Sequence, residues 1–122
     1  MGYERHRAII VSSYNKDYLM RALVSARDLG LGDLCTNMVQ SRVNGHWTFC
    51  IVPDGSKVGW EESDQAEGQR DEFWDRLEEL YREDVFCSFV EVQYRDDNGE
   101  TKIVRSSDEI EEQIRKEEDG ET

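Results

Sequence analysis

The chain has 122 residues, a length typical of one domain, and 37% of them are hydrophobic, which is enough to form a core. It carries 15 Lys and Arg against 28 Asp and Glu, and this net charge of −13 disfavours direct binding to nucleic acid. Residues 1–60 hold 7 basic and 5 acidic residues whereas residues 61–122 hold 8 and 23, so we expect an acidic face in the second half.

The chain begins with a polar stretch, and only four apolar residues, Ala8–Val11, follow it. This run is too short for a secretion signal or for a membrane span of about 20 apolar residues, so we expect a cytoplasmic protein. Ala8–Val11 instead predicts a buried strand. Apolar side chains at helical spacing then predict a helix over 16–29, with Asn15 as its N-cap and Gly30 as its stop.

Two strand-like runs, Thr36–Val43 and His46–Val52, flank Asn44-Gly45, a pair typical of a tight hairpin turn. The second run alternates, and we expect its aromatic face to lie against the helices: Trp47, Phe49 and Ile51. The aliphatic back face is too apolar to remain exposed to water, so it predicts a symmetric homodimer. Its residues are Val39, Val43, Cys50 and Val52.

A second amphipathic helix is predicted over 64–83, with a buried stripe of Ala66, Phe73, Leu77, Leu80 and Tyr81. A second hairpin follows, in which Val85–Tyr94 and Thr101–Arg105 flank Asn98-Gly99. Apolar and polar residues alternate along it, which predicts two faces. The first consists of Val90, Val92, Tyr94 and Ile103, and the second of Glu91, Gln93 and Lys102.

The chain ends in a short acidic segment that we expect to lie outside a single α+β domain of residues 1–106. Ser106 and Glu109 form a capping box that predicts a marginal helix within 107–122, with residues 118–122 disordered. The order of elements is βαββαββ followed by a helix. Its first six elements match the ferredoxin-like βαββαβ pattern, with an antiparallel sheet, an extra C-terminal strand and two helices on one face.

The second helix predicts an acidic surface opposite its apolar stripe. Carboxylates at i, i+4 rise about 6 Å along a helix, which is close to the spacing of successive phosphates in an extended strand. Such a row can imitate nucleic acid before a basic groove, or it can be a solvated face. The candidate partner-binding residues are Glu61, Glu62, Asp64, Asp71, Asp75, Glu78 and Glu79.

An alternative site lies in the loop that precedes this helix. Its small residues allow a ligand to approach the backbone, and it offers a cation and a stacking ring, so it predicts binding of an anionic, nucleotide-like molecule. It lacks the spacing of a P-loop. The candidate ligand-binding residues are Arg5, Arg7, Asp54, Ser56, Lys57 and Trp60.

No motif indicates a catalytic nucleophile, a cofactor or a metal site, and the three cysteines, Cys35, Cys50 and Cys87, are widely spaced. We therefore expect a binding protein and not an enzyme.

Several stretches resemble small bacteriophage and prophage proteins of unknown activity: Tyr3–His6 with Ala8–Val11, Val43–Gly45, Val52–Lys57 with Gly59–Asp64, and Val90–Tyr94. The resemblance implies a phage origin and a bacterial host cell. It favours a protein that blocks a host factor with a basic surface, and it assigns no catalytic residue.

Overall fold

The computed structural model describes residues 6–57, 59–83, 87–94 and 101–120, and the chain folds there into one sheet with three α-helices. The first half contains β1 (His6–Ser13), α1 (Lys16–Asp28), the 3₁₀ turn η1 (Gly32–Leu34), β2 (Val39–Gln40) and β3 (Trp47–Ile51). The second half contains α2 (Glu61–Glu83), β4 (Cys87–Tyr94), β5 (Lys102–Ser106) and α3 (Ser107–Gly120). None of the described helices is long and apolar enough to span a membrane.

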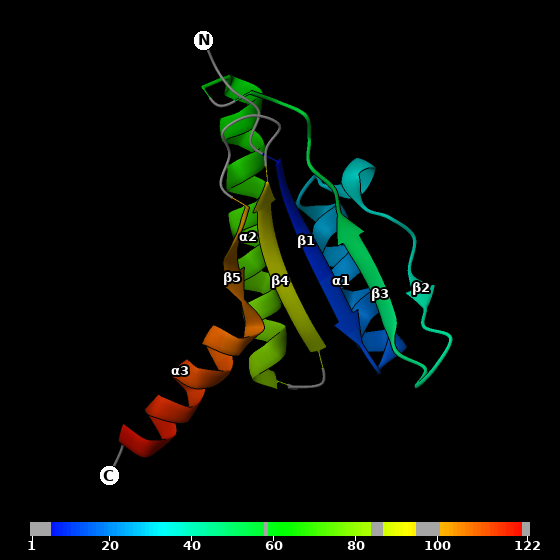
Figure 1. Ribbon diagram of the computed structural model, residues 1–122, viewed down its shortest axis with the longest axis vertical. Helices are drawn as coiled ribbons and strands as arrows, with labels where there is room; N and C mark the ends of the chain where they lie inside the picture. The colour runs from blue at the N-terminus through cyan, green and yellow to red at the C-terminus, as the bar shows by residue number, and fades with distance from the viewer. Residues whose placement is uncertain (1–5, 58, 84–86, 95–100, 121–122) are drawn as a thin grey trace.

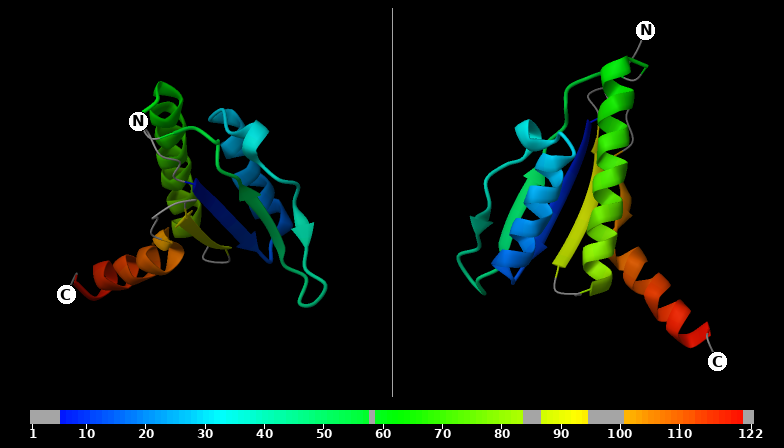
Figure 2. Two further views of the ribbon diagram at one scale, coloured as in Figure 1. Left: turned by 45° about the horizontal axis from the view of Figure 1, so that its top comes forward. Right: turned by 180° about the vertical axis from the view of Figure 1, so that it is seen from behind.

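The five strands form an antiparallel sheet in the order β2-β3-β1-β4-β5 (Figure 1). Helices α1 and α2 cover one face, whereas α3 projects from the end of the sheet beside β5 (Figure 2). The α+β class is therefore confirmed. The ferredoxin-like topology is not confirmed by this order, because β5 gives the sheet an edge strand that the four-stranded pattern lacks.

The core lies between the sheet and the two covering helices. β1, β3 and β4 contribute alternate side chains to it, so Val11 on β1 stands beside Phe49 on β3 and Phe89 on β4. The rings of Trp74 and Tyr81 on α2 approach Phe89 edge-on, with centroids 5.0 and 5.8 Å away. The predicted stripe of α2 is confirmed as buried: Ala66, Phe73, Leu77, Leu80 and Tyr81.

Helix α1 begins where it was predicted to begin and ends at Asp28, one residue before the predicted end. The Asn15 side chain accepts a hydrogen bond from the Tyr18 backbone N–H, and Gly30 follows the helix with φ +88°. Helix α2 begins at Glu61, three residues before the predicted start, because the Trp60 carbonyl already accepts from Ser63 and Asp64.

The first hairpin turn is confirmed, but its first strand is much shorter than predicted. Asn44 and Gly45 both have positive φ, at 67° and 65°. Of the predicted strand Thr36–Val43, only Val39–Gln40 forms β2. The Thr36 hydroxyl accepts the hydrogen bond of the Cys50 N–H at 2.8 Å, so a side chain takes the place of a ladder carbonyl there.

The faces of the sheet are partly as predicted. On β3, Phe49 and Ile51 are buried, whereas Trp47 is only partly buried and carries the Lys16 ammonium 4.6 Å above its ring. On β4 the alternation is confirmed, and it is the polar set, with Glu91 and Gln93, that faces the helices. The open face holds Val90, Val92, Tyr94 and Ile103. The predicted Asn98-Gly99 turn lies outside the described residues.

Helix α3 extends through Gly120, so the expectation of disorder over 118–120 is wrong, and residues 121–122 lie outside the described residues. Ile110 is buried, and Arg82 on α2 pairs with Glu117 at 2.9 Å. These contacts hold α3 against the end of α2.

Candidate functional site

The negative charge of the molecule is concentrated on two helices. Helix α2 holds ten acidic and three basic residues, a balance of −7, and α3 holds seven and two, a balance of −5. Together they carry −12 of the net −13. The two acidic helices contact each other at the end of α2.

The carboxylates on the outer face of α2 are exposed to solvent. Within the described residues no ion pair or hydrogen bond is found for six of them: Glu61, Glu62, Asp64, Glu72, Asp75 and Glu79. Helix α2 has 23 residues and is about 34 Å long, so the unpaired row extends over most of its length. Five of these positions were predicted from the sequence, and Glu72 joins them.

Two other predicted members of this row are paired with arginines. Asp71 lies 2.9 Å from Arg105 on β5, and Glu78 lies 3.4 Å from Arg82 one turn along the helix. Their charges are partly neutralised, so the surface available to a basic partner is centred on the six unpaired residues. We call these six residues the acidic ridge.

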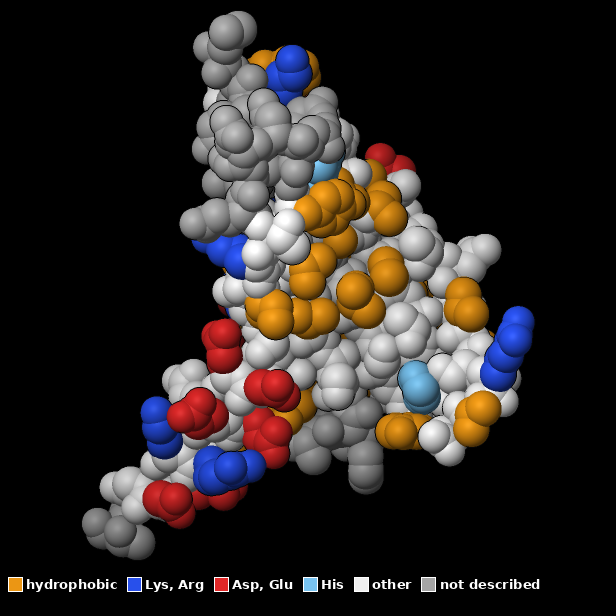
Figure 3. Space-filling view, viewed as in Figure 1, with side chains coloured by type: hydrophobic (Ala, Val, Ile, Leu, Met, Phe, Trp, Pro, Cys, Tyr) orange, Lys and Arg blue, Asp and Glu red, His pale blue; other side chains and the backbone are white. Residues whose placement is uncertain are grey.

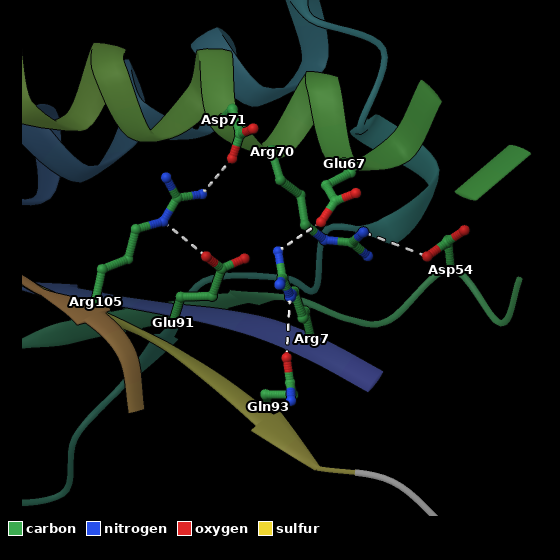
Figure 4. Close-up of polar contacts among 8 residues, drawn as sticks. All are labelled: Arg7, Asp54, Glu67, Arg70, Asp71, Glu91, Gln93 and Arg105. Atoms are coloured by element: carbon green, nitrogen blue, oxygen red, sulfur yellow. Dashed lines mark hydrogen bonds and ion pairs between the residues drawn. The ribbon is translucent and has the colours of Figure 1, made fainter. Parts of the chain in front are cut away.

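A polar network lies between α2 and the helix-facing side of the sheet (Figure 4). Arg105 joins Glu91 of β4, at 2.7 Å, to Asp71. One turn closer to the start of α2, Arg7 of β1 donates to the Glu67 carboxylate at 2.9 Å and to the amide oxygen of Gln93. This network fixes the rotation of α2 on the sheet and therefore determines which of its side chains face outward.

The sequence reasoning did not find this network. Its signal was present in β4, where Glu91 and Gln93 share the face of the buried Phe89. Two polar residues on the face of a buried aromatic indicate partners on the opposing helix, because buried polar groups are normally hydrogen-bonded.

The structure does not assemble the alternative ligand site. Arg7 is held by Glu67 and Gln93, and Arg5 lies outside the described residues. The Lys57 ammonium lies 5.9 Å from the ring centroid of Trp60, whose side chain is half exposed. Lys57 and Trp60 thus lie together as predicted, but Arg7 is bound elsewhere.

Asp54 takes part in holding the loop to α2. Arg70, which is 4% exposed, donates to the Asp54 carboxylate and to the Val52 carbonyl, both at 3.3 Å, and the Ser56 hydroxyl also donates to Asp54. Burial raises the pKa of Asp54, but the Ser56 hydrogen bond and the Arg70 charge outweigh it, so the pKa lies below its ordinary value. The Asp54 carboxylate therefore binds the loop to α2 through Arg70.

The thiols and the possible metal ligands suggest no further chemistry. Burial raises the pKa of Cys35 and Cys50, so the reactive thiolate form is disfavoured at both. In the part of the chain that the structure describes, no three His, Cys, Asp or Glu side chains are grouped as a metal site.

Comparisons of the chain with known protein families, with curated proteins and with solved structures find no match.

Proposed function

We propose that this is a non-enzymatic, phage-derived binding protein that blocks a host factor through the acidic ridge. Its site of action is the cytoplasm of a bacterial host cell. The partner is a host protein with a basic surface, such as a groove that ordinarily binds nucleic acid, and the protein itself does not bind nucleic acid directly.

The observation that carries this proposal is the run of unpaired carboxylates along α2. A solvated helix face on a stable domain commonly intersperses charges of both signs. Here two of the nearby arginines, Arg82 and Arg105, are paired at the flanks of the ridge, whereas Arg76 lies exposed beside it. Glu72, Asp75 and Glu79 of the ridge follow at i, i+3 and i+7, about 4.5 and 6 Å apart along the axis, which is similar to a row of phosphates. A basic groove would meet the ridge with complementary charge.

The test is a pull-down from bacterial lysate with a triple variant of the ridge, Asp64→Lys, Asp75→Lys and Glu79→Lys. These three side chains point away from the sheet and have no partner among the described residues, so the fold should persist. The control is Glu111→Lys, Glu112→Lys and Glu118→Lys on α3, which changes the net charge by the same amount.

We expect the wild type and the α3 control to capture a stoichiometric protein that salt elutes, and the ridge variant to lose it. Equal capture by the ridge variant, with its fold verified by circular dichroism, would contradict the proposal. A bound small molecule in place of a protein would favour the loop of Asp54, Lys57 and Trp60.

For the fold, we propose a ferredoxin-like sheet that β5 extends. β1 and β2 lie on either side of β3, and β3 and β4 lie on either side of β1. This interleaving of two β-α-β units supports the split βαβ arrangement.

A further inference from the structure

A groove of about 380 Å³ lies between α1 and α2, which pack side by side on the covered face of the sheet (Figure 2). The two helices contribute equally to its lining, with four residues from each. Across it, the Arg21 guanidinium of α1 lies 3.2 Å from the Glu83 carboxylate of α2. The start of α1 therefore borders the end of α2 here, and we call this feature the helix groove.

The helix groove exposes apolar side chains that the core does not cover. Met20 and Val24 stand one turn apart on α1, and they are 39% and 43% exposed. Leu80 of α2 also belongs to the lining. Covering such side chains removes apolar surface from water, and an unbranched methionine adapts to the shape that covers it. The groove therefore favours apolar side chains in an occupant.

The charges within the lining cancel one another. They belong to two arginines and two glutamates: Arg21, Arg76, Glu79 and Glu83. The pairing of Arg21 with Glu83 neutralises two of them, and Arg76 stands three positions before Glu79 on α2. A lining without net charge selects neither a cation nor an anion, so an apolar surface suits the groove itself.

The border of the helix groove on α2, in contrast, is negative. Glu79 belongs both to the lining and to the acidic ridge. Asp75 and Glu72, also of the ridge, lie one and two turns before Glu79 on the same helix and outside the lining. An occupant that turns apolar side chains into the groove and basic side chains toward the ridge would match both features.

We propose that the helix groove binds an amphipathic helix of the host factor, apolar on one side and basic on the other. This inference rests on the proposed function, since it names the part of the partner that meets the acidic ridge. A helix suits the groove because it presents apolar residues along one side, at i, i+3, i+4 and i+7, and can pack on α1 and α2 as a third helix.

The probe is a synthetic helix of leucine and lysine, about 14 residues long, with leucine at the apolar positions and lysine elsewhere. The comparison peptide has alanine in place of each leucine, so it keeps the charge and the helix propensity but lacks the apolar side. Binding to the full chain is measured by fluorescence anisotropy and mapped by ¹H–¹⁵N NMR. We expect the leucine peptide to bind at least tenfold more tightly and to shift the amide signals of Met20, Val24 and Glu79.

Two double variants locate the apolar contact. Met20→Gln with Val24→Thr nearly keeps the size and the charge of the groove residues, and it should weaken binding of the leucine peptide at least fivefold while the NMR spectrum keeps its dispersion. Val39→Thr with Val43→Thr makes a similar change at two exposed valines of the β2–β3 hairpin and should leave binding unchanged. Unchanged binding in the groove variant, or an equal loss in the hairpin variant, would overturn the proposal.

The ridge variant separates this inference from the proposed function. It should weaken both peptides, because the lysines of both meet the ridge, and added salt should do the same. Equal binding of the two peptides, with a loss for both in the ridge variant, would overturn the helix groove and leave the acidic ridge standing. Unchanged binding of both peptides in the ridge variant would contradict the acidic ridge and, with it, the basic side of the proposed helix.

Discussion

The Glu91 carboxylate is fully buried, and the protein holds it with one arginine. Arg105 Nε lies 2.7 Å from Glu91 Oε1, and the guanidinium also lies 4.7 Å from the ring centroid of Trp74. The second oxygen, Glu91 Oε2, has no partner among the described residues. Removing the arginine would therefore leave a buried charge without compensation, which costs far more than the loss of an exposed ion pair.

Replacing Arg105 by methionine should lower the free energy of unfolding by about 3 kcal/mol, measured by urea denaturation. The control is Arg115→Met on α3, whose pair with Glu111 is exposed on both sides, and we expect a loss below about 0.5 kcal/mol. The double variant Arg105→Met with Glu91→Met should recover most of the loss. Equal losses for Arg105→Met and Arg115→Met would contradict this prediction, because they would show that removing Arg105 does not leave an uncompensated charge on Glu91.

At the scale of elements, the two aromatic residues of β3 contribute unequally to the core. Phe49 is 1% exposed, and its ring centroid lies 6.5 Å from that of Phe73 on α2. Trp47 is only partly buried, and the Lys16 ammonium lies over its ring. Phe49→Ala should cost about 3–5 kcal/mol of unfolding free energy by leaving a cavity, and Trp47→Ala should cost clearly less. Urea denaturation of both variants decides this, and a larger loss for Trp47→Ala would reverse the assignment of the core.

Replacing two exposed glycines by alanine should change the unfolding free energy in opposite directions. Gly45 has φ +65° in the hairpin turn, so Gly45→Ala should lower the unfolding free energy by about 1 kcal/mol. Gly68 lies inside α2, and no atom lies within 4 Å of an added Cβ, so Gly68→Ala should raise it by about 0.5–1 kcal/mol. Thermal unfolding of the two variants should shift the midpoints in opposite directions, and shifts of the same sign would count against these backbone assignments.

The elements differ in how far local sequence determines them. Asn15, Gly30 and the helical spacing of apolar residues define α1, because caps and periodicity act over a few residues. β2 was predicted too long, since the Thr36 hydroxyl replaces a backbone group in its ladder. The pairing of Asp71 with Arg105 joins residues 34 positions apart, and only the assembled sheet brings them together. The acidic ridge was predicted in outline, but the loss of Asp71 and Glu78 from it was not.

At the scale of the whole molecule, self-association of a chain with a charge of −13 must avoid the acidic side. The middle of the open sheet face is apolar (Figure 3), and the face exposes Val39, Val43 and Val52. We expect a symmetric homodimer through this face, which light scattering at high protein concentration should detect. Val52→Glu should give a monomer, whereas Val24→Glu on the covered side should not, and a monomeric wild type would remove this prediction.

The position of each element also predicts how the native protein opens. β1 is bonded to β3 on one side and to β4 on the other, so its amides can exchange with deuterium only when the sheet itself comes apart. α3 is attached at the end of the chain chiefly through Ser107, Ile110 and one ion pair of Arg82. It can therefore detach without global unfolding. A protease in dilute solution would trim the protein from its C-terminus and leave the sheet, its core and the acidic ridge as a stable remnant.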